Sequence, residues 1–159
     1  IVDGIELPVG EYSFGMHAVS ARSSEGRPLA ADVEFGTGSF FSGTRRLFSG
    51  VVTWRKNRYL TTSFQLERNW VSLAEGDFDT SLVMVRLDCA FTPFISLANF
   101  VQYDSESANI GLQSRFRWIL APGNEVFVVL NHAWQEDAFD RFESAQTRLR
   151  VKVNYTFRF

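Results

Sequence analysis

Residues 149–159 have the sequence LRVKVNYTFRF, and this stretch decides the fold class. Successive side chains of an extended strand point to opposite faces, so the stretch divides into two unlike faces. Large apolar and aromatic side chains occupy one face: Leu149, Val151, Val153, Tyr155, Phe157 and Phe159. Polar and cationic side chains occupy the other: Arg150, Lys152, Asn154, Thr156 and Arg158. We therefore expect a strand that faces lipid on its apolar side.

The chain of 159 residues is rich in aromatic side chains. Its 16 Phe, 4 Trp and 4 Tyr make up 15% of the residues, whereas charged residues make up 21%. This combination fits strands that are apolar on one face only. No segment approaches the roughly 18 to 20 consecutive apolar residues that a membrane-spanning helix needs. If the chain crosses a membrane, it must do so as a closed β-barrel, which also satisfies its backbone hydrogen bonds in lipid.

Charge and composition argue against several classes of function. A formal net charge of −2 disfavours a broad nucleic-acid-binding surface, so we expect no nucleic acid partner. Cys89 is the only cysteine, which excludes an internal disulfide and a zinc site built from several thiolates. His17 and His132 lie far apart in the sequence and lack the spacing of a metal-binding HExxH motif. We expect neither a metal site nor a cofactor.

Two-residue alternation between turn signals recurs along the chain and predicts an all-β fold. We expect about nine antiparallel strands in up-and-down order, each long enough to cross hydrocarbon when tilted, at residues 11–22, 29–38, 44–55, 59–70, 79–91, 94–104, 108–120, 125–134 and 146–158. Two of them alternate less cleanly. Arg68 is in phase with apolar neighbours, and residues 126–130 are all apolar.

The predicted connections alternate in length. Tight turns with Pro, Gly or Asn are expected on one side of the sheet and longer polar links on the other, at residues 71–78, 105–107 and 135–145. Outer-membrane barrels place short turns in the periplasm and long loops outside the cell. Because such barrels have even strand numbers in bacteria, nine strands predict the carboxyl-terminal segment of a larger transmembrane β-barrel, with further strands and domains upstream.

Six cationic side chains fall on the polar faces of the clearest strands, and a barrel would direct them into its lumen: Arg86, Arg115, Arg117, Arg148, Arg150 and Lys152. The structural interpretation is that they pair across strands with Asp88, Glu67, Asp32 or Glu34. The functional interpretation is a basic wall that attracts anionic solutes, since charged rings in pores act on passing ions.

The four tryptophans lie toward the ends of the predicted strands: Trp54, Trp70, Trp118 and Trp134. Amphipathic aromatic rings are enriched at the two interfaces of a membrane, and we expect these residues to lie there. No catalytic constellation is visible, because the Gly-x-Ser-x-Gly elbow is absent and nothing selects one of the many serines for a Ser-His-acid arrangement.

Seven segments together resemble the carboxyl-terminal barrel region of an uncharacterised bacterial outer-membrane family, which carries an upstream carbohydrate-binding-like β-sandwich of the family nine type. They are LPVGEY (7–12), GTGSFFSG (36–43), FTP (91–93), VQYDS (101–105), RFRW (115–118), APGNEVFVV (121–129) and YTFRF (155–159). The resemblance implies an outer-membrane location with lipid as a partner. It also implies a signal at Tyr155, Phe157 and Phe159 that the barrel assembly machinery recognises.

We expect a porin-like transport or receptor barrel whose basic lumen face handles anionic or carbohydrate-derived small solutes. Two alternatives remain open. One is an outer-membrane hydrolase with its site in the outer loops or upstream. The other is a soluble β-barrel that binds a small apolar ligand, with the apolar faces turned inward.

Overall fold

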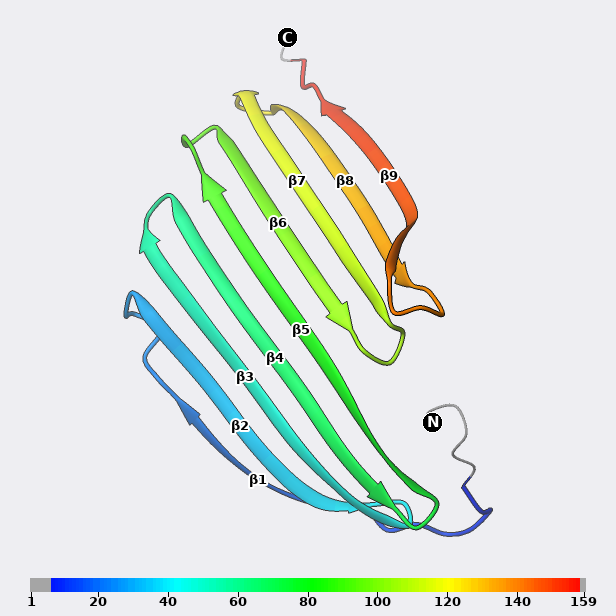
Figure 1. The fold of residues 1–159 in the computed structure, drawn as a ribbon. Coiled ribbons are helices and arrows are strands. Elements are labelled where there is room, and N and C mark those ends of the chain that lie inside the picture. The colour runs from blue at the N-terminus through cyan, green and yellow to red at the C-terminus, as the bar shows by residue number, and fades with distance from the viewer. Residues whose placement is uncertain (1–6, 158–159) are drawn as a thin grey trace.

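The computed structural model describes residues 7–157 as one antiparallel sheet of nine strands in sequence order (Figure 1). The strands are β1 (Gly15–Arg22), β2 (Leu29–Phe40), β3 (Gly43–Asn57), β4 (Leu60–Leu73), β5 (Gly76–Ala90), β6 (Ile95–Asp104), β7 (Asn109–Ala121), β8 (Asn124–Glu136) and β9 (Phe142–Asn154). The predicted all-β class and the nine up-and-down strands are confirmed. Within the described part of the chain, no helix is long and apolar enough to cross a membrane.

Several strands are longer than the sequence pattern predicted. β4 continues to Leu73 and β5 begins at Gly76, so the predicted polar link at 71–78 is wrong, and a two-residue turn joins the two strands. The polar side chains of this hairpin lie on paired strands, where Ser72 donates to Asp77 at 2.7 Å. Similarly, β9 begins at Phe142 instead of residue 146, so only residues 137–141 form the last loop.

These extensions overturn the predicted alternation of short and long connections. The turns at the end of the sheet where β9 finishes, called here the C-terminal end, span residues 23–28, 58–59, 91–94 and 122–123. Those at the opposite end span residues 41–42, 74–75, 105–108 and 137–141. Both ends carry short and longer turns, so turn length does not orient the sheet relative to a membrane.

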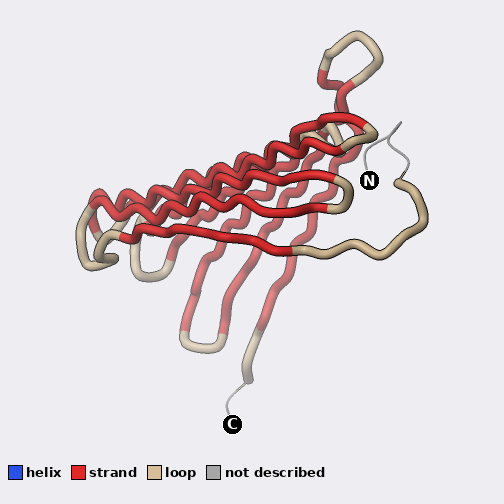
Figure 2. Tube along the Cα trace, turned by 90° about the horizontal axis from the view of Figure 1, so that it is seen from below, coloured by secondary structure: helices blue, strands red, loops and turns tan. Residues whose placement is uncertain are grey.

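The sheet curves from β1 to β9 rather than lying flat (Figure 2). Register fixes which side chains share a face, because directly paired residues of antiparallel strands point to the same side. The apolar face of the sheet includes Phe35, Val52, Phe64, Val85, Val101, Leu112, Val128 and Val151. The polar face includes Glu34, Ser49, Gln65, Arg86, Gln102, Gln113, Asn131 and Arg148.

The described residues have almost no hydrophobic core. Only Ala30, Val71 and Leu73 are buried hydrophobic side chains, and by register all three lie on the polar face. Side chains in the centre of the apolar face remain open, with Phe64 46% and Val85 40% exposed. A soluble sheet normally buries its apolar face, whereas the described sheet leaves this face open and buries no polar or charged side chain either.

The outer edges of β1 and β9 have no strand partner among the described residues, so the sheet is not closed (Figure 1). Both edge strands run in the same direction, because the strands alternate in direction and both have odd positions in the order.

Candidate functional site

The polar face carries all six cationic side chains that the sequence selected. Arg86 lies on β5, Arg115 and Arg117 on β7, and the remaining three on β9. The strand register places two of them in one row across the sheet, since Val129 of β8 pairs with Arg115 on one side and with Arg150 on the other. The cations therefore gather toward the β7–β9 half of the sheet.

Two of the six cations are paired, and not as the structural interpretation predicted. Arg86 binds Asp88 at 2.9 Å along its own strand rather than across strands. Arg117 binds Glu125 at 2.7 Å, a partner that the sequence analysis did not propose. The predicted partner Asp32 pairs instead with Arg22.

The other four cations, Arg115, Arg148, Arg150 and Lys152, form no ion pair within 4.0 Å with any residue of the range 7–157. The apolar run of β8 explains how this face accommodates them. Phe127 and Val129 lie between the cations in register, and the Arg117 guanidinium lies 5.6 Å from the Phe127 ring centroid. The stems of long basic side chains can rest on such apolar surface while their charged ends stay in water.

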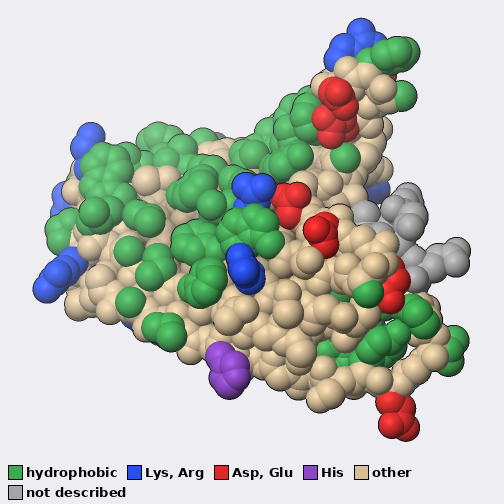
Figure 3. Space-filling view, turned by 60° about the horizontal axis from the view of Figure 1, so that its bottom comes forward, with side chains coloured by type: hydrophobic (Ala, Val, Ile, Leu, Met, Phe, Trp, Pro, Cys, Tyr) green, Lys and Arg blue, Asp and Glu red, His purple; other side chains and the backbone are tan. Residues whose placement is uncertain are grey.

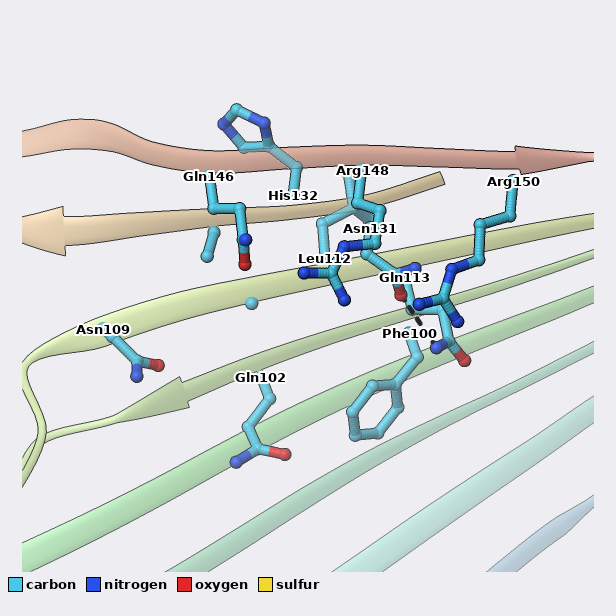
Figure 4. Close-up of a pocket in the computed structure, with 12 residues that line it drawn as sticks. Phe100, Gln102, Asn109, Leu112, Gln113, Asn131, His132, Gln146, Arg148 and Arg150 are labelled. Atoms are coloured by element: carbon cyan, nitrogen blue, oxygen red, sulfur yellow. Dashed lines mark hydrogen bonds between the residues drawn. The ribbon is translucent and has the colours of Figure 1, made fainter. Parts of the chain in front are cut away.

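Beside these cations, the polar face is hollowed over β6 to β9 by a depression of about 530 Å³ (Figure 4). We call it the amide hollow, because side-chain amides line much of it: Gln102, Asn109, Gln113, Asn131 and Gln146. The polar-face lining also includes Phe100, Gly111, Ala133, Arg148 and Arg150. In Figure 4 these side chains lie on one side of the strands, whereas His132 points to the other side.

The tryptophans lie on the apolar face, near the two ends of the sheet. Trp54 and Trp118 lie toward the C-terminal end and form the first belt, whereas Trp70 and Trp134 lie toward the opposite end and form the second. Figure 3 shows hydrophobic side chains gathered over a broad area of the surface.

The first belt is inclined to the strands. The row of residues paired in register with Trp54 crosses four strands and arrives at Ser114 on β7. Trp118 lies four residues further along β7. At about 3.3 Å per residue and 4.8 Å between strands, the offset is about 13 Å over about 19 Å. The line through the two tryptophans therefore deviates by about 35° from the perpendicular to the strands.

The second belt has the same slope. Residues paired in register with Trp134 reach β4 at Leu66, four strands from β8 and four residues short of Trp70. In both belts, the line shifts by one residue toward the C-terminal end with each strand on going across the sheet from β1 to β9. On β8, the first belt crosses at Glu125 and the second at Trp134. These two residues are about 30 Å apart along the strand, which corresponds to a perpendicular distance of about 25 Å between the two belt lines.

Arg68, which interrupts the apolar pattern of β4, lies close to the second belt. Its guanidinium binds Asp79 at 2.9 Å and lies 5.4 Å from the centroid of the Trp70 ring. The apparent conflict in the sequence pattern therefore falls at the end of the apolar face rather than in its centre.

One cluster escaped the sequence analysis, which could not select a serine. The Nδ1 atom of His132 lies 2.6 Å from the Thr147 hydroxyl, and its Nε2 atom lies 3.4 Å from the Ser144 hydroxyl. The three residues come from β8 and β9 and meet on the apolar face beside a β-bulge. Only the strand register brings them together, since no motif in the sequence gives that register.

The predicted assembly signal is described in part. Tyr155 and Phe157 follow β9, are 63% and 73% exposed, and place their rings 4.6 Å apart edge to face. Phe159, the third predicted signal residue, lies outside the described residues. No group of three His, Cys, Asp or Glu side chains that could hold a metal ion occurs between residues 7 and 157.

In comparisons with known proteins, no family model, curated protein sequence or solved structure matches this chain.

Proposed function

We propose that the nine strands form part of the wall of a bacterial outer-membrane β-barrel whose polar face lines an aqueous passage for anionic solutes. The observation that carries this proposal is the exposed apolar face. Val85 lies in its centre and Phe64 beside it, and both remain exposed over more than a third of their surface, in a described sheet that buries only three hydrophobic side chains. Hydrocarbon is the solvent that such a face requires, because in water it would drive association or collapse.

The two tryptophan belts support a membrane location independently of exposure. Strands of transmembrane barrels are tilted by about 35 to 45°, and their apolar band is about 25 Å tall between two aromatic girdles. The belts of this sheet, inclined by about 35° and separated by about 25 Å, agree with both dimensions. The soluble-barrel alternative gives no reason for two parallel belts with that spacing.

The unpaired cations support an anionic solute. Arg115, Arg148, Arg150 and Lys152 leave a positive surface on the polar face, and rings of Arg or Lys in a pore favour anions and phosphates. From the resemblance described above, we also propose that the chain belongs to an outer-membrane family with an upstream carbohydrate-binding-like domain. We further propose that the barrel assembly machinery inserts it into the membrane.

Ion selectivity in planar bilayers tests the passage. We expect the full-length polypeptide to conduct and to favour chloride over potassium, as measured by the reversal potential in a tenfold KCl gradient. Arg148→Gln combined with Arg150→Gln should shift that potential toward zero. The matched control, Arg46→Gln with Arg68→Gln, removes two cations from the apolar face and should leave the potential unchanged. No conductance, or equal shifts in both variants, would refute the proposal.

A second candidate function, ester hydrolysis, is favoured by the contact between His132 and Ser144. With Nδ1–H donating to Thr147, Nε2 is free to accept the proton of the Ser144 hydroxyl as its oxygen attacks an ester carbonyl. The histidine would return this proton to the departing alcohol. Water, which meets the apolar face at the level of the second belt, where Ser144 pairs with Trp134, would then release the acid in the same way. Because a hydroxyl replaces the usual carboxylate beside the histidine, we expect slow turnover.

Hydrolysis of p-nitrophenyl butyrate by the full-length polypeptide tests this second function. Ser144→Ala and His132→Asn should each abolish it, while Ser114→Ala, on the same face, should not. Activity that survives Ser144→Ala would exclude this site.

A further inference from the structure

The amide hollow differs chemically from a surface that merely attracts anions. Oxyanions such as phosphate act chiefly as hydrogen-bond acceptors, so a site for them needs donors. Side-chain amides present carbonyl acceptors as well as N–H donors, and hydroxyl groups can satisfy both. Five amides in one hollow therefore favour a ligand rich in hydroxyl groups.

Register explains why this part of the sheet is hollow. Gly111 and Ala133 are paired neighbours on β7 and β8, and they lie in one row between Gln102 and Gln146. The smallest two side chains thus form a floor between two long amides. A Cβ atom added at Gly111 would meet no atom within 4 Å, so the space above this floor is open.

The next row supplies the anion-binding part. Phe100, Gln113, Asn131 and Arg148 are paired in register across β6 to β9. Gln113 donates to Asn131 at 2.9 Å, and this bond fixes the orientation of two of the amides. Arg148 and Arg150 have no ion-pair partner among residues 7–157, so their guanidinium groups are free for a carboxylate, which they can bind through two hydrogen bonds. Phe100 adds apolar surface for carbon-bound hydrogens.

We propose that the amide hollow is a binding subsite for an acidic saccharide, with its carboxylate on Arg148 and Arg150, its hydroxyl groups on the amides and a ring face against Phe100. This inference rests on the proposed function, of which it names the solute. The hollow extends from the row beside that of Trp134 to Arg150, which lies about midway between the two belts, so its outer end opens toward one mouth of the passage. A subsite there is the first that a solute entering from that side would meet.

Calorimetry of the detergent-solubilised full-length polypeptide tests the subsite with three probes: digalacturonate, its neutral counterpart galactobiose, and inorganic phosphate. We expect digalacturonate to bind at least tenfold more tightly than either of the others. Arg148→Gln should weaken digalacturonate roughly tenfold or more, as expected for loss of a hydrogen bond to a charged group, and leave galactobiose unchanged.

Gly111→Leu places a bulky side chain on the floor of the hollow, where its Cβ atom would meet no atom within 4 Å, and should abolish binding of both saccharides. The matched control is Ser49→Leu, which enlarges a side chain on the polar face of β3 and should leave binding intact. Phosphate binding as tight as that of digalacturonate would reduce the hollow to a diffuse cationic surface. Equal binding of both saccharides, or binding unaffected by Gly111→Leu, would likewise overturn the proposal.

The two proposals fail separately. Anion-selective conductance without saccharide binding would leave the passage standing and remove the subsite. Saccharide binding without conductance would leave the subsite standing as that of a receptor and remove the passage.

Discussion

An arginine placed in the centre of the apolar face separates a lipid-facing sheet from a soluble one. On β5, the first belt crosses near Cys89 and the second near Thr80, so Val85 lies midway between the belts. It pairs with Phe64 and Val101, both on the apolar face. Met84, at the same depth, points to the polar face beside Gln65 and is the matched control position.

The magnitude follows from depth. An arginine on the lipid face of a transmembrane barrel costs about 2–4 kcal/mol at the midplane and about 0–1 kcal/mol near the interfaces. We therefore expect Val85→Arg to lower the folding equilibrium constant by a factor of roughly 30 to 1,000. In water, the same substitution at a side chain that is already 40% exposed would cost no more than about 0.5 kcal/mol. Met84→Arg adds a cation to a polar face that already carries several, and should cost far less than Val85→Arg in a membrane.

The assay is urea-dependent folding of the full-length polypeptide into phosphatidylcholine vesicles, followed by tryptophan fluorescence. The expected order of stability is parent, Met84→Arg, then Val85→Arg, with the largest gap before the last. If Val85→Arg folds as well as the parent, or if Met84→Arg is the more damaging of the two, the apolar face does not meet hydrocarbon and the membrane assignment is wrong.

Three further predictions concern the belts, the β1 edge and the last loop. In variants that keep one tryptophan each, quenching by brominated lipids should place all four rings about 12 Å from the bilayer midplane; a ring near the centre would contradict the belts. Gly38→Ala should lower the free energy of unfolding by about 1–3 kcal/mol and speed amide exchange in β1, because the added Cβ atom would lie 1.9 Å from the Gly15 carbonyl oxygen. Gly111→Ala, whose Cβ atom would meet no atom within 4 Å, should have neither effect, and equal effects of the two substitutions would contradict this prediction. The backbone N–H of Arg141 donates to the Asp137 carboxylate and holds its pKa below the ordinary 3.8, with further bonds from Phe139 N–H and the Arg141 guanidinium. The order of residues 137–141 should therefore persist above pH 3.8 and decline as the pH falls below it, as measured by amide exchange at Phe139 and Arg141; Asp137→Asn should abolish this pH dependence, and an unchanged profile would contradict it.

The sequence predicted the strands well because alternation is a local property. The stretch at 149–153 has one apolar face and one cationic face, and its register with β8 keeps the two apart. Alternation failed at strand ends, where polar residues such as Ser72 and Asp77 are equally compatible with a loop. Their pairing across the β4–β5 hairpin decides in favour of strand, and that pairing is not visible from composition.

The candidate site shows the same limit. Each cation could be assigned to the polar face from its own strand, but its neighbours depend on the register between strands. Val129 seemed to break the pattern of β8, yet it lies between Arg115 and Arg150 on the polar face. The pairing of Gly111 with Ala133 creates the hollow, and no pattern within either strand could predict it.

The two open edges connect the topology with the proposed environment. Each edge of the described sheet presents backbone N–H and C=O groups without a strand partner, and in hydrocarbon each such group costs several kcal/mol. Direct pairing of β1 with β9 would satisfy them only as a parallel pair, because both strands run the same way. Bacterial barrels are antiparallel throughout and have even strand numbers, so a barrel of that kind needs an odd number of further strands between these edges. The belts add a constraint, since every added strand must continue the slope of one residue per strand for the apolar band to stay level around the wall.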